Sequence, residues 1–208
     1  MLDPNTVFIF FTTSILLALS PGPDNLFVMT QAALQGRKAG LLVTLGLCTG
    51  LLFHTAAVTF GLAAIIKTSA TAFILLKFVG AGYLLYLAWQ VFRAGAVTGA
   101  PAGVDRLNSG ALYRRGIIMN ITNPKVSIFF LAFLPQFVNP LRGALTAQFL
   151  LLGAVFIIAT LIVFGTISLL AGVFGERFRK SESAQKLLNR VAGSIFIGLA
   201  LKLALTQR

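Results

Sequence analysis

The chain has 208 residues, of which 57% are hydrophobic and only 11% are charged, and its mean hydropathy is +0.91. A soluble domain is typically about 25% charged, because charged side chains cover much of the surface that faces water. The composition therefore argues against a soluble enzyme or a soluble nucleic-acid-binding module, although the net charge is +12. An all-α membrane protein is predicted.

The first half of the chain contains three apolar segments that are predicted to cross the bilayer as helices: residues 6–35, 40–66 and 70–92. The second segment is the clearest, since no charged residue lies between Lys38 and Lys67 and about 20 helical residues suffice for a crossing. The first segment is interrupted at Pro21-Gly22-Pro23, so a broken helix is predicted there. Close helix packing is expected at four glycines of the second segment: Gly40, Gly46, Gly50 and Gly61.

The second half contains three more predicted spans: residues 113–138, 145–174 and 187–205. The first of these is interrupted at Asn123-Pro124-Lys125. The last is the weakest, because it crosses only if Arg190 and Lys202 reach opposite interfaces. Six spans are predicted, and five remain the alternative.

Lysine and arginine residues are unevenly distributed between the two sets of loops. Eleven lie in or beside the loops that follow the first, third and fifth segments, and four lie on the other side. Cytoplasmic loops carry the excess of these residues, so both termini are expected to face outside. Membrane lipid is an expected partner, whereas no soluble segment shows the interleaved basic and aromatic residues that favour nucleic acid.

The two halves, residues 1–93 and 113–208, have matching interruptions on either side of an expected cytoplasmic loop at 94–112. Pro21 and Pro124 are 103 positions apart, and each lies within the first span of its half. Because each half has three spans, the two copies would lie in opposite orientations. Inverted repeats with broken helices at corresponding positions point to a transporter with a binding site near the midplane.

Two charged residues lie deep in these broken spans. Asp24 precedes Arg37 by thirteen residues, and Lys125 follows Arg115 by ten, which correspond to roughly 20 Å and 15 Å of helix. A helix that restarts after a break presents unpaired amides and a positive dipole end to an anion. The substrate site is therefore predicted at the two breaks, from Pro21, Gly22, Pro23, Asp24, Asn25, Asn123, Pro124 and Lys125.

At these residues the chain resembles the lysine-exporter/homoserine–threonine-resistance (LysE/RhtB-type) family of bacterial amino-acid exporters. The motifs that carry the resemblance are Ser20-Pro21-Gly22-Pro23, Gly36-Arg37-Lys38-Ala39-Gly40, Lys77–Leu84, Asn123-Pro124-Lys125, Phe133–Phe137 and Gly193–Leu203. The resemblance implies a six-helix inner-membrane exporter, driven by the proton gradient, that expels amino acids from the cytoplasm. Its partners would be an amino acid, protons and lipid, with a homodimer left open. It would be no enzyme, and neither a cofactor nor a metal site is expected.

The opposite charges have more than one interpretation. Asp24 and Lys125 either neutralise each other structurally, or hold the ammonium and carboxylate of an amino acid; a pair that opens for ligand combines the two. Asp24 is the first candidate for proton coupling, because a buried carboxylate can exist protonated. His54, near the middle of the second span, is the second candidate. A histidine hydrogen-bonded between helices is its alternative role.

The sequence has five acidic residues, of which only Asp24 is expected at depth, where Lys125 balances it. Because an unpaired buried charge is strongly disfavoured, net-neutral substrates such as threonine, homoserine or a branched apolar amino acid are favoured over lysine or arginine. Carbonyls freed at the breaks leave export of basic amino acids as the alternative. A divalent-metal exporter would have only Asp24, His54 and Cys48 as ligands, and a membrane enzyme acting on lipid has no supporting motif.

Overall fold

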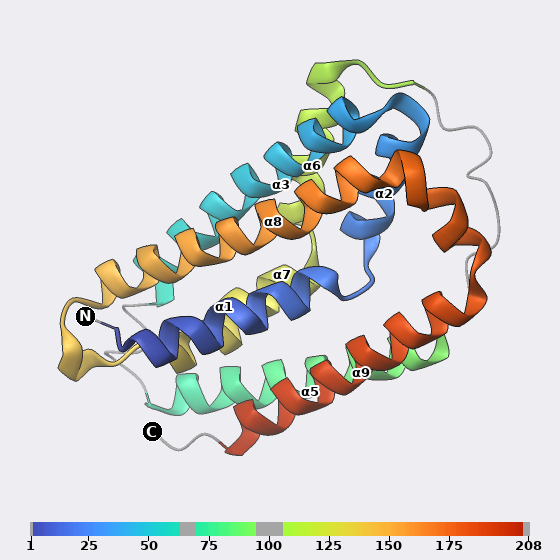
Figure 1. Cartoon of the computed structure of the whole chain (residues 1–208). Coiled ribbons are helices and arrows are strands. Elements are labelled where there is room, and N and C mark those ends of the chain that lie inside the picture. The colour runs from blue at the N-terminus through green and yellow to red at the C-terminus, as the bar shows by residue number, and fades with distance from the viewer. Residues whose placement is uncertain (1, 63–69, 95–105, 206–208) are drawn as a thin grey trace.

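A computed structural model describes residues 2–62, 70–94 and 106–205. These residues form helices and contain no strand, which confirms an all-α fold for the described part of the chain. Figure 1 shows most of the helices running along one long direction. The start of the first helix, α1 (Pro4–Leu19), and the end of the last, α9 (Glu182–Leu205), lie at the same end of the molecule.

The first half continues from α1 into α2 (Pro23–Gln35), α3 (Arg37–Ala57), the π-helical turn η1 (Val58–Leu62) and α5 (Ala70–Arg93). The side chain of Asp3 caps α1 by accepting a hydrogen bond from the amide of Asn5 at 3.1 Å. Gly36 joins α2 directly to α3 with φ 86°, a backbone conformation that disfavours residues with a Cβ.

The second half is built from α6 (Ser109–Ile121), α7 (Pro124–Ile128), η2 (Phe129–Phe133), η3 (Leu134–Phe137), η4 (Pro140–Arg142), α8 (Leu145–Lys180) and α9. η2 is π-helical, and η3 and η4 are 3₁₀ turns. α6 begins inside the expected loop, because Asn108 caps it by accepting from the amide of Ala111 at 2.8 Å.

Three continuous stretches within the described residues are long and apolar enough to cross a membrane: Arg37–Gly61, Leu145–Ala171 and Glu182–Leu205. Two bent pairs also qualify when each is taken as one broken span. α1 and α2 meet at 63°, and the helical stretches Ser109–Ile121 and Pro124–Phe137 meet at 47°. By length and composition, the described residues therefore contain between three and five candidate spans, which is consistent with a helical membrane protein.

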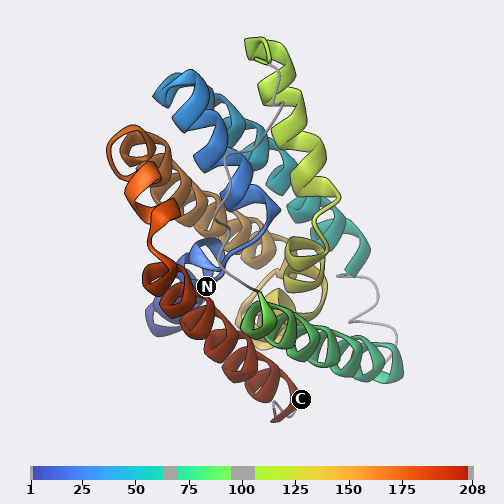
Figure 2. The ribbon, with the colours of Figure 1, turned by 90° about the vertical axis from the view of Figure 1, so that its right-hand side faces the viewer.

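The long helices pack side by side (Figures 1 and 2). α5 lies beside α9, while α3 packs against both α6 and α8. A Cβ on Gly46 would collide with the Tyr113 carbonyl, and one on Gly50 would lie 2.6 Å from Asn120 Cβ. Small residues thus let α3 approach α6 closely. The close packing expected at Gly61 is not found among the described residues, since none of their heavy atoms lies within 4 Å of the Cβ position.

An aromatic cluster fills the core between α1, η2, η3 and α8. Phe10 of α1 contacts Phe137 edge-to-face, with ring centroids 5.0 Å apart. Phe129 lies 5.1 Å from Phe133 and 5.2 Å from Phe156 of α8. Such ring pairs stabilise beyond their buried area. The cluster holds η2 and η3, which follow the second break, against α1, which precedes the first break.

Candidate functional site

The break between α1 and α2 leaves backbone carbonyls without partners in their own helix. Pro21 has no amide hydrogen, and Pro23 is the first residue of α2, where a missing amide is tolerated. The last carbonyls of a helix must find other donors. Asn25 supplies one, since its Nδ2 donates to the carbonyl of Ala18 at 2.7 Å.

The break between α6 and α7 is capped by its own sequence. Thr122 ends α6, and the Asn123 side chain accepts a hydrogen bond from the amide of Lys125 at 3.0 Å. Pro124 is the first residue of α7. An asparagine cap followed by proline is a strong local signal for a helix start. The predicted interruption is therefore present, and Asn123 is the N-cap of the helix that follows it.

The two breaks meet in the interior and their polar side chains interlock. The ammonium of Lys125 donates to the carbonyl oxygens of Leu17 at 3.3 Å and Ser20 at 3.0 Å. The amide of Asn123 donates to Asp24 Oδ2 at 2.7 Å. Lys125 is 7% exposed, and Asp24 and Asn123 are each 3% exposed. Residues about 100 positions apart thus form one buried polar cluster.

The charges in this cluster are placed at helix ends. Lys125 sits at the negative end of α1, and Asp24 lies in the first turn of α2, near its positive end. The two charges interact electrostatically, but among the described ion pairs none joins them within 4.0 Å. Asp24 Oδ1 and Asn25 Oδ1 are buried without a hydrogen-bond partner among the described residues. Both oxygens can accept from a ligand's ammonium.

His54 lies beside this cluster. Its Nε2 is 3.1 Å from the carbonyl oxygen of Asn120, and it interacts electrostatically with Asp24. A hydrogen bond between α3 and α6 is therefore present. His54 is also close enough to Asp24 for their charges to interact. Among the residues that the structure describes, no group of three or more His, Cys, Asp or Glu side chains could hold a metal ion.

Asn120 is a member of the cluster that the sequence analysis missed. It is 3% exposed, and its Oδ1 has no hydrogen-bond partner among the described side chains and backbone. Its carbonyl accepts a hydrogen bond from the Asn123 amide at 3.1 Å, and its place three residues before the Asn123 cap is a usable signal. Two amides at that spacing within an apolar span indicate a buried polar face.

A cavity of about 730 Å³ lies against the first break. Pro21, Gly22, Pro23 and Asn25 form one wall, and residues of α5, α8 and α9 form the others. Asp24 is absent from this described lining, as is Lys125. Seven of the eight predicted site residues therefore divide between a buried cluster and the wall of a cavity. The eighth, Pro124, is exposed and starts α7.

The chain is similar to known proteins over more than nine-tenths of its length. A profile of the family described as LysE type translocator matches residues 15–207. A homoserine/homoserine lactone efflux protein of Salmonella typhimurium is 35% identical over 190 residues, covering 91% of each chain. An uncharacterized membrane protein of Vibrio cholerae is 33% identical and covers 94% of each. A leucine efflux protein of Salmonella choleraesuis is 30% identical, covering 93% of this chain and 92% of its own. No solved structure matches.

Proposed function

The chain belongs to the LysE type translocator family, and we propose that it exports net-neutral amino acids from the cytoplasm, driven by the proton gradient. Its named relatives are efflux proteins for homoserine, homoserine lactone and leucine, so the proposal needs a binding site and no catalytic residue. The site is the pair of helix breaks, with the bacterial inner membrane as the location.

The burial of Asp24 and Lys125 in one polar cluster carries the proposal. A zwitterionic amino acid has one positive and one negative end, and the site offers one buried carboxylate and one buried ammonium. The substrate ammonium would bind Asp24, whose Oδ1 has no partner among the described residues. The substrate carboxylate would draw Lys125 Nζ from the carbonyls of Leu17 and Ser20. Substrate binding would then replace the contacts of Lys125 with the end of α1 and give Asp24 Oδ1 a hydrogen-bond donor.

Charge balance favours neutral over basic substrates. Asp24 is the one acidic residue buried among the described side chains, and Lys125 offsets it. Asp3 pairs with Arg142 at 3.7 Å and Glu182 with Lys186 at 3.0 Å, both on exposed surfaces. A lysine or arginine substrate would bring a second positive charge without a second buried carboxylate, which is costly.

The helix arrangement supports six spans in two inverted halves, residues 1–93 and 113–208, joined by 94–112. α3 packs against α6, and its counterpart α8 packs against α1 and α2. α5, a helix of 24 residues, lies beside its counterpart α9. Rocking one half against the other about the two breaks would expose the site to each side in turn. Both termini would then face the periplasm.

Proton coupling is assigned to Asp24, with His54 as the residue that responds to it. A proton on Asp24 removes the charge that holds the substrate ammonium, so protonation from outside would release the amino acid and drive the return step. His54 is placed to respond because it interacts electrostatically with Asp24. One titrating carboxylate can thus couple substrate exit to proton entry.

Efflux from proteoliposomes tests the proposal. Vesicles containing the purified protein are loaded with radiolabelled leucine, threonine or lysine, with and without an imposed pH gradient. Neutral amino acids should leave faster than lysine, and the gradient should accelerate them. Protein-free vesicles are the control. Equal rates with and without the gradient would contradict proton coupling, and preferential lysine efflux would contradict the substrate class.

A further inference from the structure

The cavity of about 730 Å³ beside the first break has a chemistry distinct from that of the charged cluster. We propose that it binds the substrate's side chain, and that the side chain it selects is apolar and at least as large as that of leucine. The inference rests on the proposed export function and narrows the substrate class.

The described lining of the cavity carries no charged side chain and is mostly aliphatic. Its apolar lining includes Leu26, Met29, Val91, Ile167, Leu170 and Leu188. Ligand sites that bind apolar groups are lined in this way, with a few polar groups that fix orientation. An ammonium or guanidinium side chain would find no carboxylate there.

Gly22, a residue without a side chain, lines the cavity and also lies against the charged cluster. A Cβ on Gly22 would lie 3.2 Å from Lys125 Nζ and 3.8 Å from Asn25 Oδ1. Gly22 is therefore a point where the cavity wall and the charged cluster are adjacent, and Asn25 belongs to the same wall. An amino acid whose charged groups replace contacts of Lys125 and Asp24 would need only to pass Gly22 for its side chain to enter the cavity.

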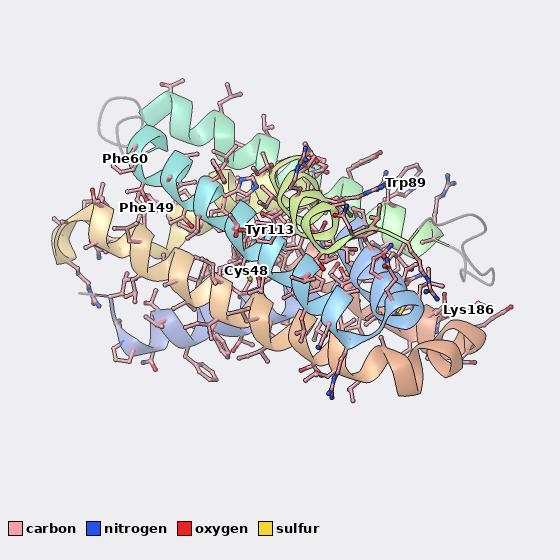
Figure 3. All side chains as sticks on the ribbon, turned by 90° about the horizontal axis from the view of Figure 1, so that it is seen from above. Cys48, Phe60, Trp89, Tyr113, Phe149 and Lys186 are labelled. Atoms are coloured by element: carbon pink, nitrogen blue, oxygen red, sulfur yellow. The ribbon has the colours of Figure 1, made fainter. Side chains whose placement is uncertain are left out.

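The cavity lies toward the end of the molecule that is predicted to face the cytoplasm. Its lining includes Gln90 near the end of α5 and Gln185 near the start of α9. Figure 3 shows their sequence neighbours Trp89 and Lys186 at one end, with Phe60 at the other. An exporter loads from the cytoplasm, so the cavity is on the side from which the substrate arrives.

The size of the cavity sets an order of preference. About 730 Å³ is large for one aliphatic side chain and falls within the range of sites for larger organic ligands. Leucine and phenylalanine should therefore bind better than threonine or homoserine, and alanine should bind least well. A methylene in an apolar pocket changes discrimination by about 10-fold or more.

Neighbouring leucines on α8 supply a matched pair of variants. Leu170 lines the cavity, whereas Leu169 does not and is 54% exposed. In proteoliposomes, unlabelled leucine and alanine compete against efflux of labelled threonine. Leu170→Ser should lower the apparent affinity for leucine relative to alanine by about 10-fold, and Leu169→Ser should keep the wild-type ratio. Met29→Ser on α2 is a second lining variant should Leu170→Ser not reconstitute.

The outcomes separate the inference from the proposed function. Wild-type protein that exports threonine but binds alanine as well as leucine overturns the inference and leaves the proposed function intact. Lining variants that weaken both competitors equally also overturn it. Native mass spectrometry tests whether a lipid occupies the cavity instead. If Leu170→Ser loses a bound lipid but keeps the wild-type ratio of leucine to alanine affinity, the cavity binds lipid and the inference is overturned. Wild-type protein that exports no neutral amino acid removes the proposed function and the inference together.

Discussion

Lys125 shows how a charged side chain is accommodated deep in this protein. Lys125 is 7% exposed, and its ammonium donates to two carbonyls at the end of α1 instead of forming a direct ion pair with a described carboxylate. Those carbonyls form the negative end of the helix dipole and lack partners in their own helix. The interaction therefore satisfies both sides, yet each carbonyl bond is weaker than a bond to a substrate carboxylate.

Asp24→Asn is expected to abolish efflux, so that the initial rate falls to that of protein-free vesicles. The amide keeps the shape but carries neither the charge for an ammonium nor a proton to exchange. Asp24 is buried, so folding is checked first by size-exclusion chromatography of the solubilised protein.

Combining Asp24→Asn with Lys125→Met separates a structural pair from a functional one. We expect the double variant to fold and to remain inactive, because the substrate then meets neither charge. Restored efflux in the double variant would mean that the two charges only neutralise each other. The assay is the same proteoliposome efflux, with protein amounts matched by immunoblot.

Asn123 has two tasks that substitutions can separate. Its Oδ1 caps α7, and its Nδ2 donates to Asp24. Asn123→Asp keeps the cap but replaces the donor with a second carboxylate, so we expect a folded protein with impaired efflux. Asn123→Ala loses both interactions and should also lose about 1 kcal/mol of stability through the cap. Thermal melting and efflux are measured on each; normal efflux by Asn123→Asp would contradict the assigned role.

The helices are held by close backbone contacts as well as by aromatic packing. Gly46 and Gly116 let α3 and α6 touch through their backbones, as small residues do in membrane helices. α6 leads directly into Asn123. The α3–α6 contact therefore positions the second break, and widening it would move Lys125 away from α1.

Gly46→Ala is expected to destabilise the protein by about 1–3 kcal/mol, because the added methyl group would collide with the Tyr113 carbonyl. Gly165→Ala on α8 is the matched control, since no described heavy atom lies within 4 Å of its Cβ position. Melting temperatures in detergent compare the two. A Gly46→Ala variant that melts with wild type would show that α3 and α6 lie farther apart.

The described part of the chain begins and ends on one side of the molecule, as the six proposed crossings would require. The start of α1 and the end of α9 lie together, and the α8–α9 connection lies at the opposite end (Figure 1). The excess of lysine and arginine in the loops at that opposite end predicts a cytoplasmic location. The six crossings that we propose are consistent with both observations.

Cysteine labelling in intact cells tests this orientation. In a Cys48→Ser background, Leu205→Cys should react with a membrane-impermeant maleimide from outside, because Leu205 is 76% exposed at the end of α9. Lys186→Cys near the start of α9 should react only after permeabilisation. The reverse pattern would mean an inverted chain, and labelling of both sites from outside would mean that α9 does not cross.

Much of the fold and part of the candidate site are readable from the sequence. Long uncharged runs predict membrane helices because exposed charge is costly in lipid, and Pro21 and Pro124 predict the two breaks because proline lacks an amide hydrogen. Their depth is also predictable, since helical rise converts residue number into distance. These features follow from local covalent geometry and the thickness of the bilayer.

Tertiary packing decided the partners of the site residues. The sequence places Asp24 and Lys125 at depth, but the rotation of each helix determines that Asn123 reaches Asp24 and that Lys125 reaches the carbonyls of α1. The same rotation places the cavity across Gly22 from the charges. A side chain's partner depends on which faces of distant helices meet, and close packing of aromatic and small residues sets those faces.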